Sequence, residues 1–191
     1  MERRDLLKMI VAATGAAMIG LPALVQGQAP AAGAKTPFSD ADVGTLDEIA
    51  ETILPRTATP GAKDAGAGLF MARFVADCYT PRQQATFRAG LVDIDKRAGG
   101  RFASLAPQSR TDLLRALDAE ARKHAVDVTE TGTAAEGEAM PHYFTMIKQL
   151  AIFGFFTSKV GATDVLRYVA VPGRYDGDLA YVPGTPAWGT S

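Results

Sequence analysis

Apolar residues recur at helical spacing along most of the chain. Between residues 39 and 170 they return every three or four positions, which is the period of a helix with one buried side. No stretch alternates between apolar and polar residues as a half-buried strand would. The pattern therefore predicts an all-α fold, with a single helical domain of about five helices followed by an irregular C-terminal tail.

The first helix is predicted to begin after Ser39 and to end at Pro55. Ser39 is a good N-cap residue, and acidic residues follow it in the first turn, where they interact favourably with the helix dipole. A proline and a glycine at positions 60 and 61 mark residues 55–63 as a loop. The expected buried side of the helix consists of Val43, Leu46, Ile49, Ala50, Ile53 and Leu54.

The second helix is expected to run from about Asp64 to Tyr79, with Asp64 as its cap. Its large apolar residues share one predicted side, which would make Cys78 a buried apolar residue. That side consists of Leu69, Phe70, Phe74, Val75 and Cys78.

Two more helices are predicted between residues 80 and 126. One begins at Thr80 and Pro81, a capping residue followed by a proline at the first helical position, and it ends at the glycines 99 and 100. Its buried side is expected to contain Phe87, Leu91 and Ile94. The next begins at residue 107 and fades after residue 124, and residues 127–139 are polar and are expected to form a loop.

A fifth helix is predicted to begin near Pro141. It is apolar on more than one side, so it is either the central helix of the core or part of an interface. A short helix is expected around residues 163–168. Residues 171–191 contain repeated Pro-Gly and Asp-Gly pairs, which are typical of irregular structure.

The N-terminus has the pattern of an export signal. A charged start is followed by an uncharged apolar stretch at residues 9–25, which is typical of a signal peptide. The residues Arg3, Arg4, Leu6, Leu7 and Lys8 resemble the twin-arginine export signal, although Glu2 replaces the usual serine or threonine. A membrane anchor and a general secretion signal are the alternatives. The predicted organisation is a twin-arginine signal peptide at 1–29, a linker at 30–38, a helical domain at 39–170 and a tail at 171–191.

Composition and motifs argue against several functions. The formal net charge of −1 and the lack of a Lys/Arg run argue against nucleic acid as a partner. One cysteine excludes an internal disulfide and an iron–sulfur cluster, and two histidines, His124 and His142, leave little scope for metal binding or acid–base catalysis. The chain contains no dinucleotide, P-loop, haem-attachment or zinc-protease motif. We therefore expect no catalytic residue, no metal site and no cofactor in this chain.

Four segments resemble the gluconate 2-dehydrogenase subunit 3 family. They are TLDEIAETILP at 45–55, TPGAKDAG at 59–66, GFFTS at 154–158 and VPGRYDG at 171–177, and the leader matches as well. The resemblance implies a small subunit that pairs with a large FAD-containing sugar dehydrogenase of the glucose-methanol-choline type. The large subunit would be exported bound to this one by the twin-arginine translocase, and a cytochrome c subunit often takes the electrons. The tail looks most like glucoside/lactose 3-dehydrogenase small subunits, and the implied location is the periplasm.

Residues that suit an interface gather near the C-terminus. Arginine, tyrosine and tryptophan are frequent hot-spot residues, and a tryptophan near a terminus can dock into a partner. The alternatives are a helix core for the phenylalanines, a tight turn for residues 174–176 and packing on this chain's own domain for the tail. The candidate partner-binding residues are Phe153, Phe155, Phe156, Arg174, Tyr175, Asp176, Tyr181 and Trp188.

Three functions follow from these observations. The first is a non-catalytic small subunit that supports export and stability of the large catalytic subunit. The second is an independent enzyme with an unfamiliar helical site, against which the missing motifs argue. The third is a membrane-anchored periplasmic structural protein that keeps its leader.

Overall fold

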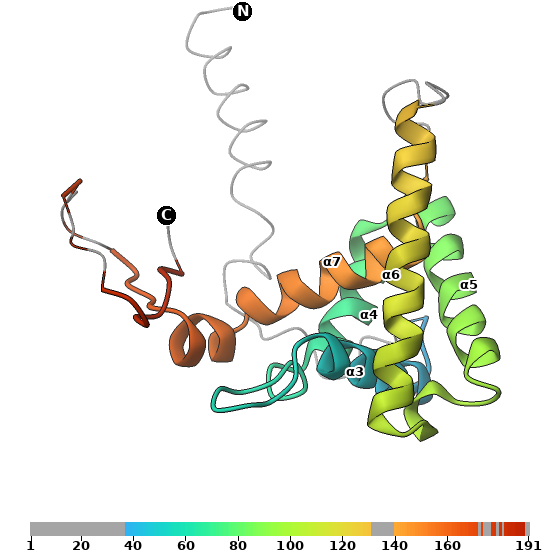
Figure 1. Cartoon of the computed structure of the whole chain (residues 1–191), viewed down its shortest axis with the longest axis horizontal. Helices are drawn as coiled ribbons and strands as arrows, with labels where there is room; N and C mark the ends of the chain where they lie inside the picture. The colour runs from blue at the N-terminus through green and yellow to red at the C-terminus, as the bar shows by residue number, and fades with distance from the viewer. Residues whose placement is uncertain are drawn as a thin grey trace, which may run out of the picture. The chain divides into compact units, whose positions relative to one another are not determined.

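The computed structural model describes residues 37–130 and 140–171, and within the tail residues 173, 177–178, 180 and 182–189. The described residues form five α-helices, a short 3₁₀ helix and a π-helical turn, with one isolated β-bridge and no strand among them (Figure 1). The predicted all-α fold is therefore confirmed for this part of the chain. The predicted signal peptide lies outside the described residues, as does all of the linker except its last two residues.

Helix α3 (Asp40–Ile53) begins and ends as the sequence predicts. The Ser39 side chain accepts a hydrogen bond from the Asp42 N–H, and the Asp42 carboxylate accepts one from the Ser39 N–H, which is a capping box. Leu46, Ile49 and Ala50 are buried along one side. The helix stops just before Pro55, since a proline disfavours helical geometry in the residue before it.

Helix α4 (Ala67–Cys78) corrects two predictions. It begins after Gly66, which has a φ of 65°, and Asp64 is not its cap. Asp64 instead accepts a hydrogen bond from the Gly61 N–H at 2.8 Å and pairs with Arg56, so it holds the preceding turn.

The buried side of α4 also differs from the prediction, because small residues face the core. Ala67, Gly68, Met71, Ala72 and Val75 are buried, whereas Leu69 and Cys78 are exposed. A Cβ atom on Gly68 would lie 2.5 Å from Asp47 Oδ1, so α4 lies closely against α3 at this point. The small side chains allow this approach, while Phe70 and Phe74 are only partly buried at the edge of the core.

Helices α5 (Pro81–Arg97) and α6 (Pro107–Glu130) flank the 3₁₀ helix η1 (Phe102–Ser104). A second capping box, between Thr80 and Gln83, confirms the predicted start of α5, and its predicted buried side is confirmed as well. Helix α6 extends to residue 130, so the prediction that it fades after residue 124 was wrong. No glycine or proline occurs between residues 124 and 130 to end it. Residues 131–139 of the predicted loop lie outside the described residues.

Helix α7 (Tyr143–Phe156) is the central helix and contacts each of the other four. Its buried residues include Phe144, Ile147 and Leu150. Gly90 of α5 allows a close approach, because a Cβ there would lie 2.4 Å from the Tyr143 ring. The π-helical turn η2 (Gly161–Val165) follows, and it overlaps the short helix predicted around residues 163–168 only at 163–165, because the backbone is extended from Leu166.

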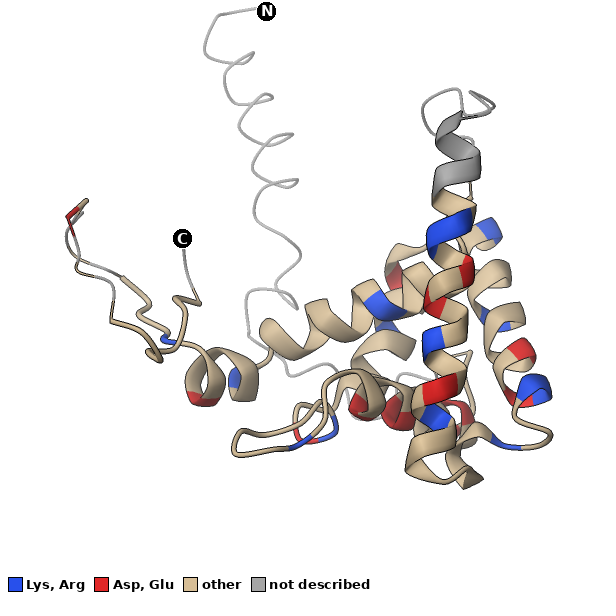
Figure 2. Ribbon diagram, viewed as in Figure 1, with Lys and Arg blue, Asp and Glu red and all other residues tan. Residues whose placement is uncertain are grey.

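Polar contacts connect the helices around this core. Arg110 of α6 pairs with Glu48 of α3, and its guanidinium also donates to the carbonyl oxygens of Leu105 and Ala103 around η1. Lys148 of α7 donates to Asp118 of α6 at 2.6 Å. Figure 2 shows that blue and red residues alternate along α5 and α6, which is typical of solvent-facing helices.

A candidate partner-binding surface

The C-terminal half of α7 carries apolar side chains that the rest of the described chain leaves exposed. Phe153 is 48% exposed, and Ile152 and Phe156 are also exposed. Leu69 of the neighbouring helix α4 is exposed as well. Scattered exposed apolar residues are ordinary, but several large ones on two adjacent helices indicate an interaction surface.

Phe153 is part of a group of aromatic rings that we call the α4–α7 aromatic cluster, consisting of Phe70, Phe74, Tyr79 and Phe153. The Phe153 ring centre lies 5.7 Å from that of Phe70 and 5.9 Å from that of Phe74. Phe74 in turn packs edge-on against Tyr79 at 5.8 Å. These separations are within the range of favourable aromatic pairs, so the cluster holds Phe153 in a fixed orientation while one side of it stays accessible.

A glycine on α7 lets α4 support this cluster. A Cβ atom on Gly154 would lie 2.5 Å from Cδ1 of Phe70, so only glycine fits without moving that ring. Phe153 directly precedes Gly154 in α7. The close approach of α4 at Gly154 therefore also places Phe70 and Phe74 against the Phe153 ring.

The C-terminal half of α7 carries no charged residue. Lys148 is the single charged residue of α7, and residues 149–158 contain none. Figure 2 shows the C-terminal half of α7 in tan throughout, in contrast to α5 and α6. The exposed apolar side chains of this half of α7 are costly to leave in water and favourable to cover with another protein.

The predicted interface residues differ in how exposed they are in the structure. Phe153 and Phe156 are exposed on α7, while Phe155 is 4% exposed and belongs to the core. Trp188 is half exposed in the tail. Arg174, Tyr175, Asp176 and Tyr181 lie outside the described residues, so their predicted role stays a prediction.

The tail is held by a clasp between Arg167 and Trp188. The Arg167 guanidinium lies 4.2 Å from the centre of the Trp188 ring. The Arg167 N–H donates to the Ala187 carbonyl, and the Gly189 N–H donates to the Arg167 carbonyl, each at 2.8 Å. Val171 and Val182, which lie between the clasped positions in sequence, are exposed. The tail thus brings more apolar side chains to the surface.

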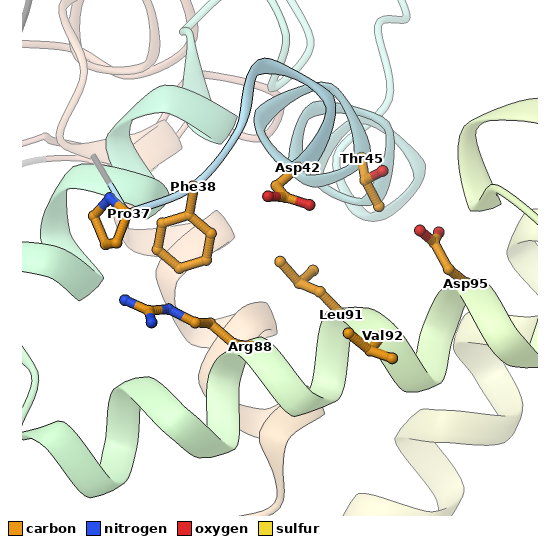
Figure 3. A pocket seen from close by; sticks show the side chains of 8 residues that line it. All are labelled: Pro37, Phe38, Asp42, Thr45, Arg88, Leu91, Val92 and Asp95. Atoms are coloured by element: carbon orange, nitrogen blue, oxygen red, sulfur yellow. The ribbon is translucent and has the colours of Figure 1, made fainter. Parts of the chain in front are cut away.

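A small pocket lies where the described chain enters the helical domain. It has a volume of about 230 Å³ and lies between the start of α3 and α5 (Figure 3). Arg88 lies over the Phe38 ring at its edge, and Asp42 and Asp95 accept hydrogen bonds from the Ser39 and Phe102 N–H groups respectively. Both carboxylates therefore serve the fold. The lining residues are Pro37, Phe38, Asp42, Thr45, Arg88, Leu91, Val92 and Asp95.

A polar network joins α5, α6 and the start of α7. The Tyr143 hydroxyl donates to Asp93 at 2.6 Å, and Arg97 donates to both Asp93 and Glu120. Burial, followed by the hydrogen bond to Asp93, raises the pKa of Tyr143 well above its usual range. The Tyr143 hydrogen bond, opposed by burial and aided by Arg97, lowers the pKa of Asp93. Asp93 therefore stays charged and structural. Within the described residues no three His, Cys, Asp or Glu side chains are grouped so that they could hold a metal ion.

The comparison with protein families identifies the chain. The model for gluconate 2-dehydrogenase subunit 3 matches residues 40–173. The chain belongs to this family. It is thus a small subunit of a dehydrogenase complex, which implies a larger catalytic partner. No curated protein and no solved structure matches the chain significantly.

The family match covers all five described α-helices and therefore the whole α4–α7 aromatic cluster. It ends at residue 173, so Trp188 lies beyond it. Among the described residues no helix is both long enough and apolar enough to cross a membrane.

Sequence reasoning assigned Phe70 and Phe74 to the core, and so missed their role in supporting an exposed residue of α7. The signal that could have corrected this was the spacing of small residues in α4. Ala67, Gly68, Met71, Ala72 and Val75 themselves recur at helical spacing, and they offer a side along which another helix can approach closely.

Proposed function

We propose that this chain is the non-catalytic small subunit of a periplasmic, FAD-dependent sugar dehydrogenase of the glucose-methanol-choline type. FAD belongs to the large catalytic subunit, and this chain carries no cofactor. The observation that carries the proposal is an exposed, uncharged aromatic surface on α7 in a member of a subunit family. The glucoside/lactose 3-dehydrogenase type, with a cytochrome c subunit as electron acceptor, is the specific form that we propose.

Phe153 is the central contact in this proposal. Its ring is held by Phe70 and Phe74 before any partner arrives, so little side-chain freedom is lost on binding. A large preorganised aromatic side chain surrounded by apolar neighbours is typical of a binding hot spot. Phe156 and the tail around Trp188 would extend the contact.

The escort role follows from linkage between binding and folding. A subunit that binds only the folded form of the large subunit stabilises that form. The residues Arg3, Arg4, Leu6, Leu7 and Lys8 would then direct the assembled complex to the twin-arginine translocase, which takes folded proteins.

The export test changes only the twin arginines. With Arg3→Lys and Arg4→Lys together, both subunits should stay in the cytoplasm, as measured by fractionation and dehydrogenase activity. The matched control is Arg82→Lys and Arg101→Lys, which alters two exposed arginines of the helical domain. A large subunit that still reached the periplasm with the altered leader would refute the escort role.

The docking test compares two exposed apolar residues. Phe153→Asp should abolish co-purification of a yellow flavoprotein with this chain, because a charge would be buried in the interface. Val92→Asp is the control, since Val92 is 69% exposed on α5 and lies away from the cluster. Equal recovery of the flavoprotein with both variants would remove the α4–α7 surface from the proposal.

The independent-enzyme alternative has a direct test. The purified chain should be colourless and should not reduce a dye acceptor with sugars as donors. Sugar oxidation by the isolated chain would replace the subunit proposal with that alternative. Intact-mass measurement of the exported chain tests the membrane-anchored alternative, which requires that residues 1–29 stay attached.

A further inference from the structure

The two histidines of the chain face each other where α6 and α7 meet. The ring centres of His124, on α6, and His142, directly before α7, are 5.9 Å apart. Both side chains are partly buried. The His142 ring also stacks on Tyr143, with 4.4 Å between the ring centres. This arrangement has no part in the proposed partner contact.

Each histidine holds backbone at the start of α7. His142 Nδ1 accepts a hydrogen bond from the Phe144 N–H at 3.2 Å and so caps the helix. His124 Nε2 lies 3.1 Å from the Met140 carbonyl oxygen, and because a carbonyl only accepts, Nε2 carries the hydrogen. The cap requires Nδ1 of His142 to be unprotonated, so it exists only while that ring is neutral.

A proton on His142 would act against the helix in two ways. It removes the acceptor for the Phe144 N–H. It also places a positive charge at the N-terminus of α7, where the helix dipole disfavours cations.

Charged groups from the packed helices also face His142. Glu120 on α6 and Asp93 on α5 favour its protonated form, whereas Arg97 on α5 and His124 on α6 disfavour it. Arg97 donates to both carboxylates, so much of their negative charge is already compensated. Burial is the largest effect and His124 the second, and together they lower the pKa of His142.

We propose that His124 and His142 together clamp the first turn of α7, and that the clamp is pH-sensitive because protonation of His142 removes its cap on the Phe144 N–H. The stability contributed by neutral His142 is complete above the ordinary imidazole value of 6.5. It is lost as the pH falls through the lower value of the folded chain. Because α7 contacts every other α-helix of the domain, release of its first turn loosens the core around Phe144. The clamp depends only on this chain's own residues and is independent of the proposed function.

The main test compares melting temperatures at about pH 7.5 and about pH 5, on either side of the imidazole value. Asparagine caps a helix at either pH, so His142→Asn should melt near the wild-type temperature at the higher pH. Between the two pH values it should lose about 2–4 °C less than the wild type, the shift that a lost cap produces in a domain of this size. An equal acid-induced drop in both proteins would overturn the clamp.

A second measurement isolates the interaction between the histidines. His124→Gln keeps an N–H donor for the Met140 carbonyl but removes the ionisable neighbour, so the His142 titration followed by NMR should move to higher pH. In the wild type, the protection of the Phe144 amide against exchange, measured relative to its intrinsic rate at each pH, should fall as the pH falls through the same range. A His142 titration that is unchanged in His124→Gln, or a Phe144 protection that does not fall there, would contradict the proposal.

Discussion

The two halves of α7 differ in how much of their apolar surface the rest of the described chain covers. The N-terminal half buries Phe144, Met146 and Ile147, whereas the C-terminal half leaves Phe153 and Phe156 exposed although it buries Phe155. In the first half, Tyr143 lies against Gly90 of α5 and Lys148 pairs with Asp118 of α6, whereas in the second half Gly154 lies against Phe70 of α4. The comparison teaches that an apolar helix segment predicts that other protein atoms will cover it, but does not identify which part of this chain, or which partner, supplies them. In one half this chain supplies them, and in the other half we propose that the large subunit does.

The largest difference between the halves should appear when a ring is removed from each. Phe144→Ala leaves a cavity in the core and should destabilise the chain by about 3–5 kcal/mol. Phe153→Ala removes a half-exposed ring and should cost about 1 kcal/mol or less. Urea unfolding of the isolated variants measures both values. Similar losses for the two variants would mean that the halves are equally important to the fold.

A smaller effect is expected where α4 approaches α7. Gly154→Ala places a methyl group 2.5 Å from the Phe70 ring, and such overpacking costs about 1–3 kcal/mol. Gly44→Ala is the matched control, because that helical glycine has no atom within 4 Å of the added Cβ and alanine should stabilise it by about 1 kcal/mol. The two substitutions should therefore have opposite signs in thermal unfolding. A stabilising Gly154→Ala would show that the contact is loose.

The ion pair of the buried half should give a modest pH dependence. Hydrogen bonding from Lys148, opposed by burial and aided by Arg122, lowers the pKa of Asp118 below its ordinary value of 3.8. Its contribution is therefore present above that value and is lost as the pH falls through the folded value. With Asp118→Asn, the unfolding free energy should fall less between about pH 5 and pH 2 than it does in the wild type, by less than about 1 kcal/mol. Denaturant titrations across this pH range measure the difference. An equal fall in both proteins would leave Lys148 without an energetic role.

The smallest effect on stability is expected in the tail. Arg167→Gln removes the cation over Trp188 and should change the unfolding free energy of the helical domain by less than about 0.5 kcal/mol. Trp188 is the only tryptophan, so its fluorescence reports on the clasp directly and should shift to longer wavelength. A large fall in domain stability would instead indicate that the tail is part of the core.

Local signals made the starts of α3 and α5 predictable. Each of the capping boxes that begin at Ser39 and Thr80 involves only four consecutive residues, so it forms without contacts from distant parts of the chain. The end of α6 was mispredicted because its last turns carry few apolar residues, yet nothing in them breaks a helix. The orientation of α4 was mispredicted because the large apolar residues were taken to be buried. Close packing against α3 favoured the small residues instead.

The sequence by itself determined the helical class, the capping boxes of α3 and α5, the family and the apolar character of α7, because these depend on residues near one another in the chain. Only the tertiary structure decided which apolar residues remain accessible. Which residues stay accessible depends on how closely α4 can approach α3 and α7. This approach depends on Gly68 lying against Asp47 and Gly154 lying against Phe70, pairs that are distant in sequence. The tertiary structure also places His124 next to His142, which is 18 positions away in the sequence, and no local pattern predicts this contact.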